Sequence, residues 1–265
     1  MKQFILPSPP DSRGVVRLSG KDFHYLVRVR RLKEGAVFNA LLPSGEEVRV
    51  LVQSLAGDCL TGDCLPVNMV DETSLPPIIL FQALPKGAKL DLIVRQAAEG
   101  GIAEIHPFVS DYSIHGTFET GRVERWRRII KEARQQSGSS IATKIAAPCM
   151  VEALLSYWET LKEQRKRPLG LIFHQEQTGP LANGGFHGYL SSDPDLVVLA
   201  VGPEGGFSPE EVAEFLTAGF KPLVMGNTIL RTETAALYGA AAVRIILLER
   251  AAWTLTDLSL TSPKQ

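Results

Sequence analysis

The sequence predicts an α/β protein in which a parallel sheet is covered by helices and preceded by a smaller β-rich region. Beyond about residue 77, short apolar runs alternate with helical patterns, whereas residues 1 to about 71 contain β-rich segments separated by glycine turns. Alternating strands and helices are typical of a parallel sheet with helices outside. At 265 residues with 45% hydrophobic residues, the chain can form one large domain or two unequal ones.

The β-rich region predicts a small barrel. Its strand candidates are Val15–Leu18, Ala36–Leu42 and Glu47–Leu55, with Gly and Ser-Gly turns between them. Residues 71–77, Asp-Glu-Thr-Ser-Leu-Pro-Pro, form a candidate linker because paired prolines interrupt regular structure. We therefore expect domains at 1–72 and 73–265.

The second domain is predicted to contain five strands separated by helices. Each candidate is a short apolar run bounded by turn residues, which favours a buried strand. The five candidates are Ile78–Ala83, Glu104–Phe108, Leu169–Phe173, Leu196–Val201 and Pro222–Met225.

Two loops that follow the last two strands predict a ligand site. Residues 201–208 read Val-Gly-Pro-Glu-Gly-Gly-Phe-Ser, and residues 225–235 read Met-Gly-Asn-Thr-Ile-Leu-Arg-Thr-Glu-Thr-Ala. Glycines at strand ends let backbone approach a ligand, and open α/β sheets bind ligands at the strand carboxyl ends. The first loop alone is equally an ordinary turn. In the second, Thr232 or Thr234 can cap a helix and Glu233 suits its positive end, which leaves Arg231 unexplained.

Together these loops closely resemble the cofactor-binding region of the SPOUT methyltransferases, and within them the family of ribosomal RNA small-subunit methyltransferase E. The resemblance continues through Leu84–Gly87, Glu99–Pro107, Arg125-Trp126, Glu132-Ala133 and Gln136–Gly138, and covers most of the chain. It implies a trefoil-knotted parallel sheet with helices on both faces, after a PUA-like β-barrel. It also implies a homodimer that methylates N3 of a uridine in 16S ribosomal RNA with S-adenosylmethionine.

The resemblance assigns the cofactor site to the two loops and the strand before the first. The residues expected to bind S-adenosylmethionine are Leu199, Gly202, Pro203, Glu204, Gly205, Gly206, Met225, Gly226, Ile229, Leu230, Arg231, Thr232, Thr234 and Ala235. Methyl transfer then depends mainly on alignment and on dispersing charge. Arg231 is expected to favour the uracil imidate, with Glu204 and Glu233 as candidate bases. A salt bridge from Arg231 to one of these acids is the structural alternative.

Two basic clusters are candidate RNA contacts. One lies on a predicted helix whose apolar side carries Val123, Trp126, Ile130 and Ala133. Its cations are Arg122, Arg125, Arg127, Arg128, Lys131 and Arg134, and the second cluster contains His24, Arg28, Arg30 and Arg31. A solvated polar face is the alternative for the helix, and phosphate contact is what the resemblance implies.

Several positions depart from the family pattern. Gln96 stands where a lysine is usual, Gly100 where leucine is usual and Tyr112 where arginine is usual, while Gln135 and Ser139 replace an acid and an arginine. These changes concern the substrate side more than the cofactor loops. They leave open another methylated nucleotide, for example in tRNA, and a non-catalytic module that binds cofactor or RNA.

Composition is compatible with a cytoplasmic enzyme. The net charge of −1 gives no overall attraction to nucleic acid, so RNA contact requires local basic patches. Cys59, Cys64 and Cys149 lack the spacing of a metal site, and we expect no metal. The amino terminus lacks a signal-peptide pattern, and the apolar helix expected at Ala235–Leu248 contains Arg244 and is too short for a membrane span.

Overall fold

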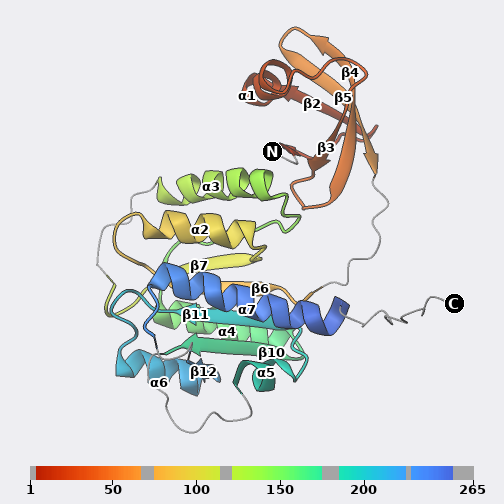
Figure 1. Ribbon diagram of the computed structural model, residues 1–265. Helices are drawn as coiled ribbons and strands as arrows, with labels where there is room; N and C mark the ends of the chain where they lie inside the picture. Colours follow the sequence, from red (N-terminus) through yellow and green to blue (C-terminus); the bar gives the residue numbers. More distant parts are fainter. Residues whose placement is uncertain (1–3, 67–74, 114–120, 175–184, 225–227, 253–265) are drawn as a thin grey trace, which may run out of the picture. The chain divides into compact units, whose positions relative to one another are not determined.

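The computed structural model describes residues 4–66, 75–113, 121–174, 185–224 and 228–252 (Figure 1). The chain divides into two compact units. One contains residues 1–70, 94–103 and 119–145, and the other contains residues 71–93, 104–118 and 146–265. A contiguous boundary at residue 72 stays a prediction.

The first unit is built around a curled five-stranded sheet. The strands are β1 (Phe4–Ile5), β2 (Val15–Ser19), β3 (Val37–Leu41), β4 (Glu47–Ala56) and β5 (Cys59–Pro66), in the order β1-β3-β4-β5-β2. The pair β1–β3 is parallel, and the other pairs are antiparallel. Val48, Val50 and Val52 alternate into the core, the pattern of a sheet with one buried face. The three strands predicted from sequence in this region are confirmed.

Strand β5 and the helical segment after β2 were not predicted. In β5, Gly62 interrupts the apolar pattern, yet a Cβ there would lie 2.7 Å from Cγ1 of Val50 and 2.8 Å from the carbonyl oxygen of Leu51. Glycine is thus needed where two strands approach closely. The helical segment consists of α1 (Gly20–Phe23) and the π-helix η1 (His24–Val29), and the unit also contains α3 (Arg122–Ser137) and β8 (Lys144–Ile145).

The second unit contains the predicted parallel sheet. Its strands run β12-β10-β11-β6-β7, and β9 also pairs with β7. Their bounds are β6 (Ile78–Ala83), β7 (Glu104–Val109), β9 (Cys149–Met150), β10 (Pro168–Phe173), β11 (Leu196–Val201) and β12 (Lys221–Leu223). All five predicted strands are confirmed, although β12 ends at Leu223. Every residue of β6 and β11 is buried, as expected of strands covered on both faces.

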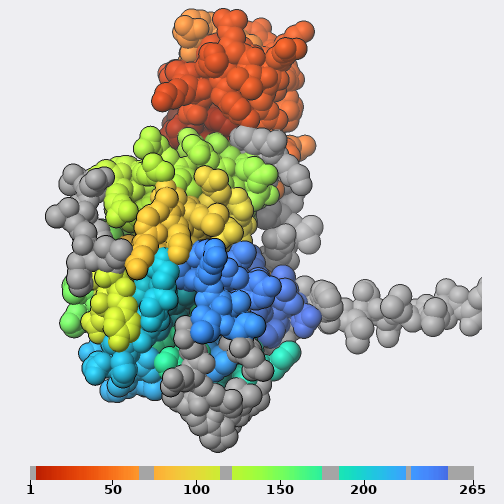
Figure 2. Space-filling model, turned by 60° about the vertical axis from the view of Figure 1, so that its left-hand side comes forward, coloured from red at the N-terminus to blue at the C-terminus, as the bar shows by residue number. Residues whose placement is uncertain are grey.

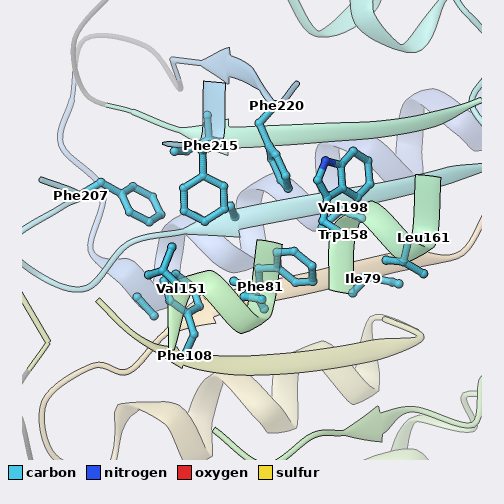
Figure 3. Packing of buried hydrophobic residues seen from close by; sticks show 14 of the residues in the cluster. Ile79, Phe81, Phe108, Val151, Trp158, Leu161, Val198, Phe207, Phe215 and Phe220 are labelled. Carbon is cyan, nitrogen blue, oxygen red and sulfur yellow. The ribbon is translucent and has the colours of Figure 1, made fainter. Parts of the chain in front are cut away.

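Helices cover both faces of this sheet (Figure 1). On one face, α4 (Val151–Gln164) and α6 (Pro209–Thr217) pack on an aromatic core that includes Phe81, Phe108 and Trp158 (Figure 3). Helix α7 (Thr232–Ala252) contacts β11 and β6, and α5 (Gly185–Leu190) contacts α7. Helix α2 (Lys89–Glu99) has residues in both units.

Helix α7 is longer than the sequence predicted, and Gly239 allows its close approach to the sheet. A Cβ at Gly239 would lie 2.0 Å from Cζ of Phe173 in β10. A larger residue would therefore displace either the helix or the phenyl ring. Among the residues described, no helix meets the length and apolarity needed to cross a membrane.

Candidate active site

The candidate site lies at the carboxyl ends of β6 and β11 and at the start of α7. In the parallel register, Val201 of β11 is paired with Gln82 of β6, so the segments that leave these strands begin side by side. The hydroxyl of Thr232, the first residue of α7, donates to the carbonyl oxygen of Gly202 at 2.7 Å and lies 2.9 Å from Nε2 of Gln82, which donates to it. One buried hydroxyl thus links three segments that are distant in sequence.

Thr232 and Thr234 were the alternatives for the cap of α7, and the contacts of Thr232 do not support it in that role. Its side chain is only 4% exposed and bonds to the loop after β11. The first intrahelical bond instead runs from the amide of Ala235 to the carbonyl oxygen of Arg231, at 2.8 Å. The hydroxyl therefore holds the start of α7 against the glycine loop after β11.

The loop after β11 turns sharply and is held by Glu204. Gly206 has φ +75°, a conformation that favours glycine, and its amide donates to the carbonyl oxygen of Pro203 at 3.0 Å. The carboxylate of Glu204 accepts hydrogen bonds from the backbone amide of Lys86, at 3.1 and 3.2 Å, and from Nζ of Lys89, at 2.5 Å. Glu204 thereby connects this loop to the segment after β6.

These contacts determine the ionisation of Glu204. Partial burial favours the neutral acid, but the hydrogen bonds from Lys89 and the backbone amides, with the Lys89 charge, outweigh it and hold the pKa of Glu204 below its usual value. A carboxylate with a lowered pKa is a weak base. The ion pair also shows that Glu204 pairs with Lys89 rather than with Arg231.

A third segment, at the end of β7, joins the site through Glu211. The Glu211 carboxylate accepts from Oγ of Ser110 at 3.0 Å, from the amide of Asp111 at 3.1 Å and from the amide of Ser208 at 2.9 Å. Ser208 completes a capping box by accepting from the Glu211 amide, and its hydroxyl donates to Asp111. This buried network fixes residues 207–211 against residues 110–113.

The second predicted loop is described only in part. Met225 and Gly226 lie outside the described residues. Ile229 is 76% exposed, Arg231 is exposed, and Leu230, Thr234 and Ala235 are half-buried. Oε2 of Glu233 is buried without a hydrogen-bond partner among the residues that the structure describes. Leu199 and Pro203 are buried, and Gly205 is exposed.

The basic residues predicted to contact RNA are exposed with a few exceptions. On α3, Trp126, Ile129, Ile130 and Ala133 form the buried side. Arg134 belongs to that side too: it is 6% exposed, and its Nη2 donates to the carbonyl oxygen of Ser140 at 3.3 Å. The predicted polar face is therefore wrong for Arg134, because position 134 is four residues from Ile130 and falls on the same side. The exposed cations on α3 are Arg122, Arg125, Arg127 and Arg128, and Lys131 is half-buried.

The basic cluster of the small sheet lies on and after η1. His24 and Arg28 are exposed on η1, and Arg31, also exposed, has φ +57°. Arg30 is half-buried, with Nη1 enclosed and unbonded among the described residues. The π-helix and the positive φ explain why a regular helical pattern was not visible in the sequence.

The residues that hold the site together were largely missed by sequence reasoning. Gln82, Lys89, Ser110 and Glu211 carry no loop motif, and their partners lie far away in the chain. The spacing Ser208-Pro-Glu-Glu211 was the one available signal, because a serine three residues before a glutamate indicates a capping box.

Comparison with known proteins identifies the family. A family model for the RNA methyltransferase domain matches residues 72–244, and one for an RNA methyltransferase PUA domain matches residues 18–58. Ribosomal RNA small subunit methyltransferase E of Synechocystis sp. is 30% identical, and the match covers 88% of this chain and 74% of that protein. The Bacillus subtilis protein of the same name is 28% identical, and the match covers 85% of this chain and 88% of that protein. The crystal structure of the Neisseria gonorrhoeae protein of that name, bound to S-adenosyl methionine, superposes with a TM-score of 0.77 at 24% identity, over 93% of this chain and 98% of that one, and shows the shared fold. The chain therefore belongs to the RNA methyltransferase family.

Proposed function

We propose that this protein uses S-adenosylmethionine to methylate N3 of a uridine in small-subunit ribosomal RNA. The observation that carries the proposal is the link from Thr232 to Gly202 and Gln82, which joins the glycine loop after β11 to the end of β6 and to the start of α7. Such loops offer backbone groups to a nucleoside ligand. The curated relatives of this chain are named for the small-subunit activity, which supports the proposal. We propose that the reaction takes place in the cytoplasm.

The residues present fit S-adenosylmethionine. Oε2 of Glu233, the residue that follows Thr232 in α7, is a buried acceptor with no partner among the described residues. An enclosed carboxylate oxygen suits a cationic ligand group, and S-adenosylmethionine carries an ammonium and a sulfonium. When bound, this cofactor supplies an electrophilic methyl group.

Within this proposal, the protein aligns the reactants and stabilises the uracil anion. N3 of uracil becomes nucleophilic when its imide proton leaves, and the exposed guanidinium of Arg231 is the proposed donor to the uracil carbonyl. Glu204 is committed to Lys86 and Lys89, so we assign it the orientation of the cofactor loop. Glu233 remains the candidate for accepting the N3 proton.

RNA is held, in this proposal, by the exposed arginines. Arg122, Arg125, Arg127 and Arg128 on α3 and Arg28 and Arg31 near η1 supply cationic groups for phosphate. Each phosphate contact to single-stranded RNA steepens the salt dependence of binding by about 0.7. Charge-removing substitutions should therefore flatten that dependence, whereas a merely solvated face would leave it unchanged.

We further propose a knotted chain and a homodimer. The return of α7 across β11 and β6 after β12 supports a knot. The dimer is supported by an apolar stripe on α7, whose surface is visible in Figure 2. Along this stripe Leu237 is 40% exposed, Tyr238 58%, Ile245 55% and Leu248 38%. Sedimentation of an Ile245→Lys variant should show dissociation, and an unchanged dimer would place the interface elsewhere.

The decisive experiment combines binding and methylation. S-adenosylmethionine is titrated into the protein by calorimetry, and the protein is then incubated with labelled cofactor and small subunits that lack the modification. Transfer of label to N3 of uridine supports the proposal. Cofactor binding without transfer to these subunits indicates either another RNA substrate or a non-catalytic module that binds the cofactor. Absence of cofactor binding indicates a non-catalytic module that binds RNA alone.

A further inference from the structure

Tyr112 is a large aromatic side chain held at the edge of the candidate site. It lies in the turn after β7 and is 52% exposed. Isolated exposed aromatic residues are common on protein surfaces and need no function. Two features of its surroundings distinguish Tyr112 from such residues.

The first feature is a rigid support on both sides of Tyr112. Before it, the Asp111 amide donates to Glu211 at 3.1 Å and the Asp111 carboxylate accepts from the Ser208 hydroxyl at 2.6 Å. After it, the Ser113 hydroxyl donates to the carbonyl oxygen of Leu84 at 3.1 Å and accepts from the Ser110 amide at 3.1 Å. The turn is therefore fixed while its tyrosine remains exposed.

The second feature is direct contact with the glycine loop. A Cβ at Gly205 would lie 3.0 Å from Cβ of Tyr112 and 3.4 Å from its Cγ. The absence of a side chain at Gly205 lets the tyrosine lie against the loop that Glu204 holds in place. An aromatic ring thus lies beside the proposed cofactor loop. Binding through this ring costs little conformational entropy, because the turn that carries Tyr112 is already ordered.

We propose that Tyr112 stacks on a base of the RNA substrate, and this inference rests on the proposed function. A planar ring on an ordered turn at the rim of the proposed nucleotide site matches the way proteins hold unpaired bases. Arginine, usual at this position in the family that the sequence resembles, would bring a charge to phosphate. Tyrosine offers the face of its aromatic ring instead, so this chain gains a stacking contact with a base and loses one ionic contact with phosphate.

The test measures whether the effect of the tyrosine ring on RNA affinity depends on the planarity of the bases. Binding of a short oligouridylate is compared with binding of the same oligomer made of 5,6-dihydrouridine, whose puckered ring stacks poorly. Loss of one base stack corresponds to about 5- to 150-fold weaker binding. We expect Tyr112→Ala to weaken oligouridylate binding within that range, and Tyr112→Phe to bind as the wild type does.

Stacking is identified by non-additive effects of the Tyr112 substitution and the dihydrouridine substitution on binding affinity. Dihydrouridine should weaken binding to the wild type and to Tyr112→Phe, and should cost little further affinity in Tyr112→Ala. Tyr112→Arg should steepen the salt dependence by about 0.7. Leu216→Ala, which truncates a 36% exposed side chain at the far end of α6, is the matched control and should change neither quantity.

The result that overturns the inference is separate from failure of the proposed function. If Tyr112→Ala lowers S-adenosylmethionine affinity as much as RNA affinity, Tyr112 supports the loop and does not stack on RNA. Equal binding of both oligomers by the wild type, or no oligouridylate binding, also refutes stacking. Failure of the proposed function would instead appear as absence of cofactor binding or methyl transfer in the wild-type protein.

Discussion

Thr232→Val should reveal how much the buried link at the site contributes to stability. Valine preserves the branched shape of threonine but removes the hydroxyl that bonds to Gly202 and Gln82. The carbonyl oxygen of Gly202 then loses this partner, whereas Nε2 of Gln82 keeps its bond to the carbonyl oxygen of Ala83. An unsatisfied buried acceptor costs about 1–3 kcal/mol, and the bond lost by Gln82 about 0.5–1.5 kcal/mol.

The expected loss of unfolding free energy is therefore about 1.5–4.5 kcal/mol. With a urea dependence of about 3 kcal/mol per molar, the unfolding midpoint should fall by roughly 0.5–1.5 M. Thr232→Ser should retain most of the stability, because it keeps the hydroxyl. Thr160→Val, which removes an exposed hydroxyl on α4, is the control and should change the free energy by no more than about 0.5 kcal/mol.

The Gln82→Met and Thr232→Val pair gives a sharper test. Each single change loses the hydrogen bond between Gln82 and Thr232, whereas the double variant loses it only once, so the double variant should be more stable than the sum of the single changes predicts. Affinity for S-adenosylmethionine, measured by calorimetry, should fall in Thr232→Val because the loop after β11 loses its anchor. A Thr232→Val protein with wild-type stability and affinity would refute the role assigned to this hydroxyl.

Three further changes test the site and the fold. Arg231→Ala should lower turnover at saturating RNA on the order of a hundredfold, because a cation at a developing charge contributes about 2.7–4 kcal/mol. Near-normal single-turnover rates in this variant would assign Arg231 to loop structure. Arg31→Ala should instead weaken RNA binding and flatten its salt dependence. Glu204→Gln should lower the urea midpoint of unfolding at pH 7, because the pKa of Glu204 is lowered in the folded protein. The stabilisation by this carboxylate is complete above about pH 4.3 and is lost as the pH falls through the lowered pKa. Equal urea midpoints for the variant and the wild type at pH 7 would contradict the role of Glu204 in holding the loop. Gly239→Leu should destabilise the fold by about 1–3 kcal/mol or more through overlap with Phe173, and an unchanged thermal midpoint would show that α7 can shift freely.

Local sequence patterns were sufficient for the five predicted strands of the second unit, but not for the two-residue β9. Ile78–Ala83 and Leu196–Val201 are continuous apolar runs, and both are buried along their whole length. A strand covered on both faces must be apolar throughout, so its composition reveals it without knowledge of its neighbours. The same local logic failed at β5, where Gly62 reflects the approach of another strand and not the preference of its own segment.

The glycine loop after β11 was visible in the sequence, because turns and positive φ depend on a few adjacent residues. The contacts that connect it with distant segments were not visible. Gln82 meets Thr232 across 150 positions, and Lys89 meets Glu204 across 115. Thr232 looked like a helix cap because its sequence neighbours allow one, and Arg134 looked exposed because its charge favours water. The sequence by itself determined the apolar strands of the second unit and the polar helix α3, since these follow from neighbouring residues. Only the tertiary structure decided which hydroxyl, carboxylate and guanidinium are enclosed, because that depends on the order of the strands and on which side of each helix packs on the core.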